Sequence, residues 1–294
     1  APMYLTLTVS KPLIRAVSFF GFAITLALFA NPAQAEHYKV FLLGGQSNMD
    51  GRAATSGLTG PYANLQNPQA DVQFYEGGSL RVLQPGSGTD FGPEITFGRT
   101  IADEFGDDNF ALIKYAVGAS DLANDWDPNT GSQYSSFQST VTNGITALTT
   151  GANAGNTYEI VGMLWTQGER DARTGRTATQ YQADLKGFIA GVRDDYGSDL
   201  PFFYSRLSSG QTDLSAGQLS AIRTAQDNVA AGDANAYLSD TDGMSIKSDN
   251  LHFDAAGQIA LGEAFALSYI SSVPEPSSLC LLAIAAAGVL IRRR

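Results

Sequence analysis

Hydrophobic residues along the middle of the chain fall into two alternating patterns. Short apolar runs rich in β-branched and aromatic residues predict buried strands at residues 38–43, 72–83, 111–117, 159–165, 201–207 and 236–239. Apolar positions spaced three or four residues apart predict helices at residues 94–105, 135–149, 178–196, 215–231 and 254–270. Strands that alternate with helices predict an α/β fold with a doubly wound, mainly parallel sheet. Residues 72–83 form a strand or a hairpin, since Gly77 and Gly78 interrupt them.

Four polar clusters follow predicted strands or precede predicted helices. They contain Ser47, Gly118, residues 167–171 and residues 249–252. In an open parallel sheet, ligands bind beyond the carboxyl ends of the strands, where such loops gather along one edge. We therefore expect the four clusters to lie together in one site.

Residues 38–52, YKVFLLGGQSNMDGR, read as a strand that runs into a glycine turn and presents Ser47 at its end. Gly45 lets the backbone come close, so that the amide of Ser47 or Asn48 can face a bound oxyanion. Serine is also a favoured helix N-cap, which is the simpler interpretation. A serine hydroxyl becomes a useful nucleophile only beside a base, usually a histidine oriented by a carboxylate.

The chain has two histidines, and His37 lies near a predicted frayed terminus. This leaves His252 as the candidate base. In the stretch from Asp249 to His252, the carboxylate is close enough to accept from Nδ1 and leave Nε2 facing a hydroxyl. The alternative is an N-cap aspartate beside a surface histidine. Together with Ser47, the pattern predicts a Ser-His-Asp triad.

Three more residues are candidates for stabilising an oxyanion or contacting substrate. Gln167 follows a strand that ends at Trp165, and its amide can donate to a developing oxyanion, although ordinary loop polarity is the alternative. Gly118 can supply a further backbone amide beside that of Ser47, or it is simply a turn glycine. Glu169 is either a hydrogen-bonding brace or a substrate contact.

Both ends of the chain read as targeting segments. Residues 1–35 have two basic residues, an apolar run and the sequence Ala33-Gln34-Ala35, which predict a secretory signal peptide cleaved after Ala35. Residues 273–294 have Pro-Glu-Pro, an apolar run at 279–291 and three arginines. That run would span roughly 20 Å as a helix, against a hydrocarbon core of roughly 30 Å, so a simple tail anchor is the weaker interpretation. Residues 36–272 suit one α/β domain.

Charge and cysteine content narrow the function. The chain has 18 Lys and Arg against 29 Asp and Glu, a net charge of −11. Five of the basic residues and one acidic residue lie outside residues 36–272, which therefore carry a net charge of −15. This charge repels nucleic acid and anionic membranes. The single cysteine, Cys280, lies in the tail, so neither a thiol nucleophile nor a zinc site is expected in the domain.

Four blocks together resemble the SGNH hydrolases, and more narrowly the sialate O-acetylesterases and acetylxylan esterases of carbohydrate esterase family 6. The blocks are GQSNMDGR (45–52), KYAVGASDL (114–122), WTQGERD (165–171) and DNLHF (249–253). The resemblance implies a three-layer α/β/α sandwich of the flavodoxin-like SGNH type around a central, mainly parallel sheet. It also implies Ser47 as nucleophile, Asp249 and His252 as its partners, and Gln167 in the oxyanion hole.

One departure concerns the second block, where a Gly-Gly pair of the family is Gly118-Ala119. A backbone donor survives this change only if Ala119 avoids a positive φ, so the oxyanion amide is that of Gly118 or Ala119. Asn48 and Arg52, like Glu169, are further candidates for contacts with substrate or with the catalytic groups. Recognition of a sialate carboxylate calls for an arginine, for which Arg52 and Arg170 are candidates.

The resemblance implies an exported serine esterase that removes O-acetyl groups from carbohydrates of the acetylxylan or sialate type, without cofactor or metal. Two alternatives remain: a general carboxylesterase or lipase-like enzyme, and a non-catalytic surface protein that binds carbohydrate. The tail resembles the PEP-CTERM sorting signal of Gram-negative bacteria, which implies processing by an exosortase-type enzyme. We therefore expect a cell-surface or extracellular protein that associates with the membrane transiently through its tail.

Overall fold

The computed structural model describes residues 35–86 and 90–273. Their core is a seven-stranded sheet with the order β4-β3-β6-β1-β7-β8-β9. The strands are β1 (His37–Gly45), β3 (Gln69–Glu76), β4 (Ser79–Leu83), β6 (Asn109–Ala116), β7 (Thr157–Thr166), β8 (Phe202–Ser205) and β9 (Ala236–Ser239). All neighbouring strands are parallel except β3 and β4. The mainly parallel sheet expected from the sequence is confirmed.

The interrupted stretch at 72–83 is a hairpin. Strands β3 and β4 are antiparallel, and the turn between them consists of Gly77 and Gly78 with φ angles of 58° and 83°. Two consecutive positive φ angles are the requirement of a type I′ turn, which glycine meets without a steric penalty.

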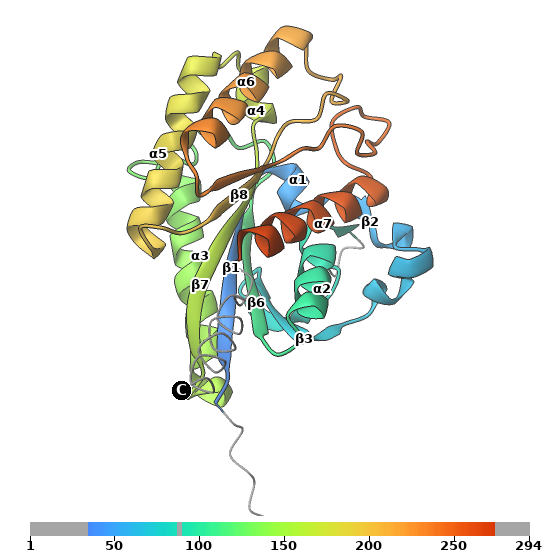
Figure 1. The fold of residues 1–294 in the computed structure, drawn as a ribbon, viewed down its shortest axis with the longest axis vertical. Helices are drawn as coiled ribbons and strands as arrows, with labels where there is room; N and C mark the ends of the chain where they lie inside the picture. The colour runs from blue at the N-terminus through green and yellow to red at the C-terminus, as the bar shows by residue number, and fades with distance from the viewer. Residues whose placement is uncertain (1–34, 87–89, 274–294) are drawn as a thin grey trace, which may run out of the picture. The chain divides into compact units, whose positions relative to one another are not determined.

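Helices cover both faces of the sheet, which completes the three layers (Figure 1). Helices α2 (Glu94–Glu104) and α7 (Ala255–Ser272) pack on one face, and α3 (Ser132–Thr149), α5 (Ala178–Tyr196) and α6 (Ala216–Gly232) pack on the other. Alternate residues of β1 point to opposite faces, so that Phe41 and Leu43 join the first core while Val40 and Leu42 join the second. Burial on both faces explains why β1 reads as a continuous apolar run.

Three helices begin with side-chain caps that the sequence provides. At α5, Thr177 and Gln180 form a capping box, and at α6 Ser215 and Gln218 form another. The side chain of Asp254 accepts from the Gly257 amide at the start of α7. These caps fix the starts of three predicted helices to within one residue of their expected positions.

Several short elements were not predicted, because they are too short to show a hydrophobic period. They are α1 (Ser47–Asp50), β2 (Ala53–Ala54), η1 (Thr55–Gly57), η2 (Gly60–Gln66), β5 (Asp90–Phe91), η3 (Gly151–Asn153) and α4 (Glu169–Arg173). Strands β2 and β5 pair in a separate two-stranded sheet. Helices α1 and α4 follow β1 and β7 directly and carry residues of the predicted site.

Strand β1 lies where the strand order changes direction. From β1 the chain passes to β3 and β4 at one end of the sheet, returns to β6 beside β1, and then continues to β7, β8 and β9 on the other side of β1. The loops after β1, β6 and β7 therefore emerge side by side at the carboxyl edge of the sheet, which is where ligands bind in doubly wound folds. Ser47, Gly118 and Gln167 all lie in these loops.

The predicted targeting segments fall almost entirely outside the described residues, so the signal peptide and the membrane-associated tail stay predictions. In the part of the chain that the structure describes, no helix is long and apolar enough to cross a membrane.

Candidate active site

Ser47 begins helix α1 immediately beyond strand β1 and is 6% exposed. The turn that presents it depends on Gly45, which has a φ of 141°. A Cβ atom at Gly45 would lie 2.2 Å from the carbonyl oxygen of Thr166 on β7, so only glycine fits there. The amide of Gln46 donates to the same oxygen at 2.9 Å, which ties the turn to the end of β7.

The loop between β9 and α7 brings His252 and Asp249 to Ser47. His252 Nε2 lies 2.9 Å from Ser47 Oγ, and His252 Nδ1 lies 2.9 Å from Asp249 Oδ2. The other oxygen of Asp249 accepts from the amides of Leu251 and His252, each at 2.9 Å. The three side chains named from the sequence therefore form one hydrogen-bonded row, although Ser47 and His252 are 205 positions apart.

The contacts of Asp249 determine its charge. Although partial burial acts to raise its pKa, hydrogen bonds from the amide and ring of His252 and from the Leu251 amide lower the pKa of Asp249 to about 2. The carboxylate is therefore ionised at all pH values near neutrality. A charged Asp249 holds the proton of His252 on Nδ1 and leaves Nε2 free to accept one.

Asn48 connects the serine turn to the histidine loop. Its side chain is fully buried, and its Nδ2 donates to Glu169 Oε1 at 2.6 Å and to the Leu251 carbonyl at 3.3 Å. Its Oδ1 accepts from the Phe253 amide at 3.0 Å. Asn48 thus binds the residues on both sides of His252.

Gln211, in the loop after β8, strengthens this connection. Its Nε2 donates to Glu169 Oε1 and to the Leu251 carbonyl, each at 3.0 Å. One oxygen of Glu169 accepts from both Asn48 and Gln211, as expected of a brace, and because Glu169 also lines the pocket at Ser47, a contact with substrate stays a prediction. The second oxygen of Glu169 is buried and has no partner among the described residues. Gln211 was not predicted from the sequence, since a lone glutamine in a loop carries no periodic or motif signal.

Backbone amides next to Ser47 are free to donate. Those of Ser47, Gly118 and Ala119 have no acceptor among the described residues. A Cβ atom built on Gly118 would lie 3.9 Å from the Ser47 Cβ, so this turn adjoins the serine. Ala119 has a φ of 60°, a conformation that costs a residue other than glycine about 1 kcal/mol or more. The Ala119 amide was expected to serve as a donor only if this residue avoided a positive φ. The observed φ therefore favours the Gly118 amide as the oxyanion donor.

Gln167 does not face the pocket at Ser47, which an oxyanion donor would have to do. Its Nε2 donates to Asp171 Oδ2 at 2.5 Å and to the Ser120 carbonyl at 3.2 Å, which uses both amide hydrogens. Its Oε1 accepts from the hydroxyl of Tyr181 at 2.9 Å. The side chain is fully buried behind the site and does not line the pocket at Ser47. The amide side chain that does line this pocket belongs to Gln46, whose Oε1 faces the amides of Gly168 and Arg170.

A pocket of about 690 Å³ opens at Ser47 and His252. Its polar lining is mostly cationic, with Arg52, Arg170, Arg173 and Lys247 against the single carboxylate of Glu169. Arg52 pairs with Asp50 at 2.6 Å, and Arg173 pairs with Asp213. Within the described chain, Arg170 and Lys247 have no carboxylate partner. This basic lining contrasts with the acidic domain around it.

A mainly parallel sheet with a hydrogen-bonded serine, histidine and aspartate beyond its central strand is the arrangement expected of an SGNH-type hydrolase. The chain belongs to the carbohydrate esterase family described as sialic acid-specific acetylesterase, whose model matches residues 37–271. The PEP-CTERM protein-sorting motif matches residues 272–294. Both resemblances noted in the sequence are thereby confirmed.

Individual relatives agree with this assignment. The chain is 31% identical over 115 residues to the probable carbohydrate esterase At4g34215 of Arabidopsis thaliana, an alignment that covers 39% of this chain and 42% of that protein. The aligned stretch thus spans less than half of that relative. The X-ray structure of the Arabidopsis protein has a TM-score of 0.64 with 22% identity, covering 80% of this chain and 98% of that one.

Two further solved structures share the fold. A carbohydrate acetylesterase from Xanthomonas citri, XAC1771, has a TM-score of 0.57 with 19% identity, covering 78% of this chain and 55% of that one. The structure of NanS has a TM-score of 0.55 with 14% identity, covering 81% of this chain and 98% of that one. At these identities the likeness concerns the fold alone.

Proposed function

We propose that this protein is a serine esterase that removes O-acetyl groups from carbohydrates through an acetyl-enzyme intermediate. The observation that carries the proposal is the row of hydrogen bonds from Ser47 through His252 to Asp249, with 2.9 Å at each step. Membership of a carbohydrate esterase family supports it, and so does the name of the Xanthomonas neighbour, a carbohydrate acetylesterase.

In the first half of the reaction, Ser47 Oγ attacks the acetyl carbonyl while His252 Nε2 takes the hydroxyl proton. The carbonyl oxygen gains negative charge, which the free amides of Ser47 and Gly118 are placed to stabilise. The ionised Asp249 stabilises the imidazolium that forms. His252 then returns its proton to the departing sugar hydroxyl, and the acetyl group remains on Ser47.

In the second half, a water molecule replaces the sugar. His252 Nε2 takes a proton from this water as it attacks the acetyl carbonyl, and the same amides receive the oxyanion. Collapse of this intermediate breaks the bond to Ser47 Oγ, which recovers its proton from His252, and acetate leaves. His252 carries the proton in every step of this cycle.

The lining of the pocket favours an acidic sugar at the acetylated position. Arg170 and Lys247 lie beside Ser47 without carboxylate partners in the described residues, in a domain with a net charge of −15. A carboxylate on the sugar, as in a sialate, would pair with them. A neutral acetylated xylose would leave both cations solvated. We therefore place the sialate type ahead of the acetylxylan type at this position.

The sorting motif at residues 272–294 fits an exported enzyme. We propose that the protein acts at the surface of a Gram-negative bacterium after an exosortase-type enzyme has processed its tail. An acidic, exported esterase would there meet acetylated polysaccharides and glycoconjugates from its surroundings.

The deciding experiment compares acetate release by the full-length protein and its Ser47→Ala variant. The substrates are 4-nitrophenyl acetate, acetylated xylan and O-acetylated N-acetylneuraminic acid. Loss of the nucleophile is expected to lower kcat by about 10⁴-fold or more on every substrate that the wild type hydrolyses. Ser139→Ala, on the exposed side of α3, is the matched control and should keep wild-type rates.

Each alternative function predicts a different result. Equal rates for the wild type and Ser47→Ala would point to a non-catalytic carbohydrate-binding protein. Faster turnover of 4-nitrophenyl butyrate than of the acetate, without release of acetate from glycans, would point to a general carboxylesterase. Preference for the acetylated sialic acid over acetylated xylan would support the role given to Arg170 and Lys247.

A further inference from the structure

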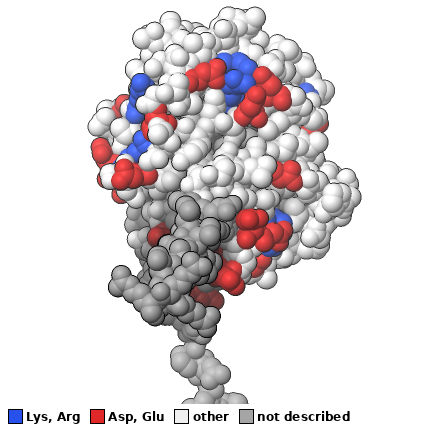
Figure 2. All heavy atoms as spheres, in the orientation of Figure 1, with Lys and Arg blue, Asp and Glu red and all other residues white. Residues whose placement is uncertain are grey.

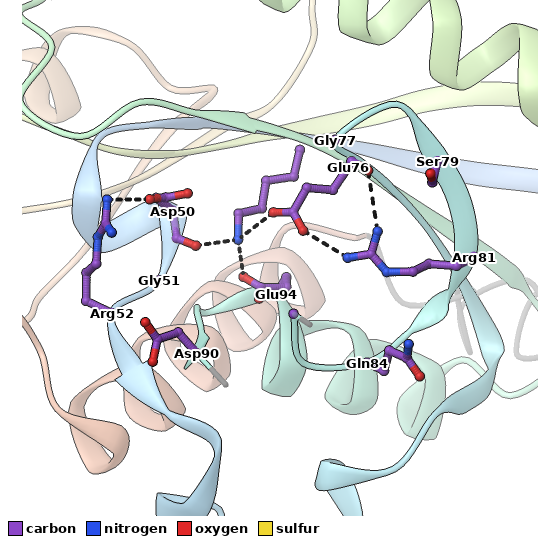
Figure 3. A pocket seen from close by; sticks show the side chains of 12 residues that line it. Asp50, Gly51, Arg52, Glu76, Gly77, Ser79, Arg81, Gln84, Asp90 and Glu94 are labelled. Atoms are coloured by element: carbon purple, nitrogen blue, oxygen red, sulfur yellow. Dashed lines mark hydrogen bonds and ion pairs between the residues drawn. The ribbon is translucent and has the colours of Figure 1, made fainter. Parts of the chain in front are cut away.

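A second cleft, drawn in Figure 3, shares Arg52 with the pocket at Ser47. Its volume is about 580 Å³, within the range of sites for small organic ligands. The segment after α1, the β3–β4 hairpin and the start of α2 line it, together with Lys114 of β6. In Figure 3, the Asp50–Arg52 pair borders one side and the Glu76–Arg81 pair borders the other.

Arg52 joins this cleft to the pocket at Ser47, since it lines both. Its Nη2 lies 3.1 Å from the position of a Cβ atom on Gly118, the glycine next to Ser47, and 2.6 Å from Asp50 Oδ2. The guanidinium is thus held between the serine and the cleft. A chain molecule with one unit at Ser47 would have to pass the Arg52 side chain to reach the cleft.

The floor of the cleft is a fixed ionic network around Lys114, whose side chain is 2% exposed. Its Nζ lies 3.0 Å from Glu94 Oε2, 3.3 Å from Glu76 Oε1 and 2.8 Å from the Asp50 carbonyl oxygen. Three acceptors match the three protons of an ammonium group. Glu94 also accepts from the Gly92 amide at 2.9 Å. Lys114 and Glu94 are therefore structural, and any ligand meets the groups nearer the rim.

The rim carries donors and acceptors in fixed pairs. Arg81 donates to Glu76 Oε2 at 2.9 Å and lies over the ring of Phe74, 4.8 Å from its centroid. Asp90 is exposed and has no side-chain partner within the described residues. A guanidinium has five donor hydrogens and a carboxylate about four acceptor sites. After pairing with each other, these side chains therefore still have donors and acceptors that can bind a ligand. Because opposite charges alternate around the rim, the cleft favours no strongly charged ligand.

Hydroxyl groups match this lining best. A hydroxyl donates and accepts at once, so neighbouring hydroxyls can bridge an arginine and a carboxylate in place of water. An apolar ligand would strip water from the charged groups without replacing their hydrogen bonds. A divalent cation is disfavoured by the ammonium group of Lys114, and no three His, Cys, Asp or Glu residues in the described chain are grouped to hold a metal.

We propose that the cleft is a subsite for neutral sugar units of a glycan chain that continues from the acetylated sugar at Ser47. This inference rests on the proposed function and adds that the substrate is an oligosaccharide or polysaccharide. Binding of these units makes the enzyme more efficient on longer chains. An isolated acetylated sugar, or an aryl acetate, reaches only the pocket at Ser47.

The test fills the cleft without touching the groups at Ser47. Ser79 lines the cleft from the exposed start of β4, and Ser79→Trp places a bulky ring there. We measure kcat/KM for 4-nitrophenyl acetate, for free O-acetylated N-acetylneuraminic acid, and for the same acetylated sugar at the end of oligosaccharides of two, four and six sugars. For the wild type, kcat/KM should rise with chain length. For Ser79→Trp, it should fall at least tenfold on four and six sugars and stay unchanged on 4-nitrophenyl acetate and the single sugar.

Two more variants guard against indirect effects. Ser139→Trp introduces the same ring on the exposed side of α3 and should match the wild type on all substrates. Gln84→Ala removes one polar contact at the rim of the cleft and should lower kcat/KM a few-fold on long chains only.

A wild-type kcat/KM that is independent of chain length would overturn the subsite. So would a Ser79→Trp loss that is equal on 4-nitrophenyl acetate, or inactivity on all of the acetylated oligosaccharides while the free acetylated sialic acid is still hydrolysed. Failure of the proposed function looks different, because 4-nitrophenyl acetate would then be hydrolysed equally by the wild type and Ser47→Ala.

Discussion

At the scale of single residues, backbone and side-chain contacts decide which groups near Ser47 can take part in chemistry. Gln167 has the right chemical character for an oxyanion donor, but Asp171 and the Ser120 carbonyl use both of its amide hydrogens. Ser47 and Gly118, in contrast, have amides without acceptors in the described chain. The availability of a donor, rather than its residue type, therefore identifies the backbone amides as the proposed oxyanion hole.

Asp249→Asn tests the charge behind His252. The amide has nearly the same shape, but its Oδ1 cannot hold the Nδ1 proton as a carboxylate does, and its NH2 favours the wrong tautomer of the imidazole. We expect kcat on 4-nitrophenyl acetate to fall by about 10⁴-fold at pH 7, with little change in KM. Because the pKa of Asp249 is about 2, the wild type should show no loss from this carboxylate between pH 4 and 8.

The control for this variant is Asp103→Asn, which alters an exposed carboxylate on α2 paired with Arg99. It should retain full activity. If Asp249→Asn kept more than a tenth of the wild-type kcat, the orientation of His252 by a charged partner would have to be abandoned.

At the scale of elements, much of the architecture was readable from hydrophobic periodicity. Helix α5 and strand β9 have the predicted bounds, and each other long element lies within a few residues of its prediction. Periodicity works for these elements because each buries a regular face against the sheet. The site could be anticipated for a different reason. Ser47, Gly118 and Gln167 follow β1, β6 and β7, and Asp249 and His252 lie in the loop after β9; the carboxyl ends of parallel strands lie at the same edge of the sheet.

What the sequence could not show is how the loops interlock. Helix α4 is too short to show a hydrophobic period, and Gln211 belongs to no motif; their importance comes from contacts across long sequence separations, such as the one between Gln211 and Glu169. The occupied amide of Gln167 was equally hidden, since nothing in the block WTQGERD indicates that Gln167 donates to Asp171 within it. Such pairings depend on the packed geometry and not on local pattern.

Asn48 and Gln211, which both donate to Glu169 and to the Leu251 carbonyl, form a buried clamp on the histidine loop. Gln211→Ala tests whether this clamp positions His252. The variant removes one donor from the Leu251 carbonyl and one from Glu169, which allows the histidine loop to shift. We expect kcat on 4-nitrophenyl acetate to fall about tenfold with KM nearly unchanged, because small misplacements act on the transition state. The free energy of unfolding should fall by about 1 to 3 kcal/mol, as buried acceptors lose a partner.

Gln182→Ala is the matched control, since Gln182 accepts from Asn228 between α5 and α6 and does not contact the histidine loop. Asn48→Asp separates the contacts further: it keeps the acceptor for the Phe253 amide but sets a carboxylate against Glu169. We expect it to be less active than Gln211→Ala. A Gln211→Ala enzyme that lost stability but kept its kcat would show that the clamp only stabilises the fold.

At the scale of the whole molecule, many of the Asp and Glu side chains lie close to Lys or Arg side chains, which offsets part of the negative charge. On the face drawn in Figure 2, Asp and Glu side chains lie around the visible Lys and Arg side chains. Arg206, for example, contacts Asp227, Asp240 and Asp242. Exposed pairs of this kind contribute little each, so they offset charge repulsion more than they stabilise the fold. The carboxyl groups that matter most for pH dependence are instead the buried ones.

Asp171 is the buried carboxyl group with the clearest consequence for stability. Burial raises its pKa to about 6, against the lowering effect of hydrogen bonds from Gln167 and the Leu122 amide. Its Oδ1 has no partner among the described residues. The folded protein holds this proton more tightly than the unfolded chain does. The resulting contribution to the free energy of unfolding is therefore fully present below about pH 4. It is lost as the pH rises through about 6, and the loss amounts to about 3 kcal/mol.

Asp171→Asn removes this titration while nearly keeping the shape of the side chain. Urea unfolding at pH 4 and pH 7.5, under identical salt, gives the stability of the variant relative to the wild type at each pH. We expect this difference to become more favourable to the variant by about 3 kcal/mol between the two values, whatever its starting sign, because all other groups titrate equally in both proteins. Asp184→Asn, which alters a partly exposed carboxylate paired with Arg176, should show a much smaller change. A difference that stays constant with pH would mean that Asp171 is ionised in the folded protein throughout this range, held by donors stronger than those of Gln167 and Leu122.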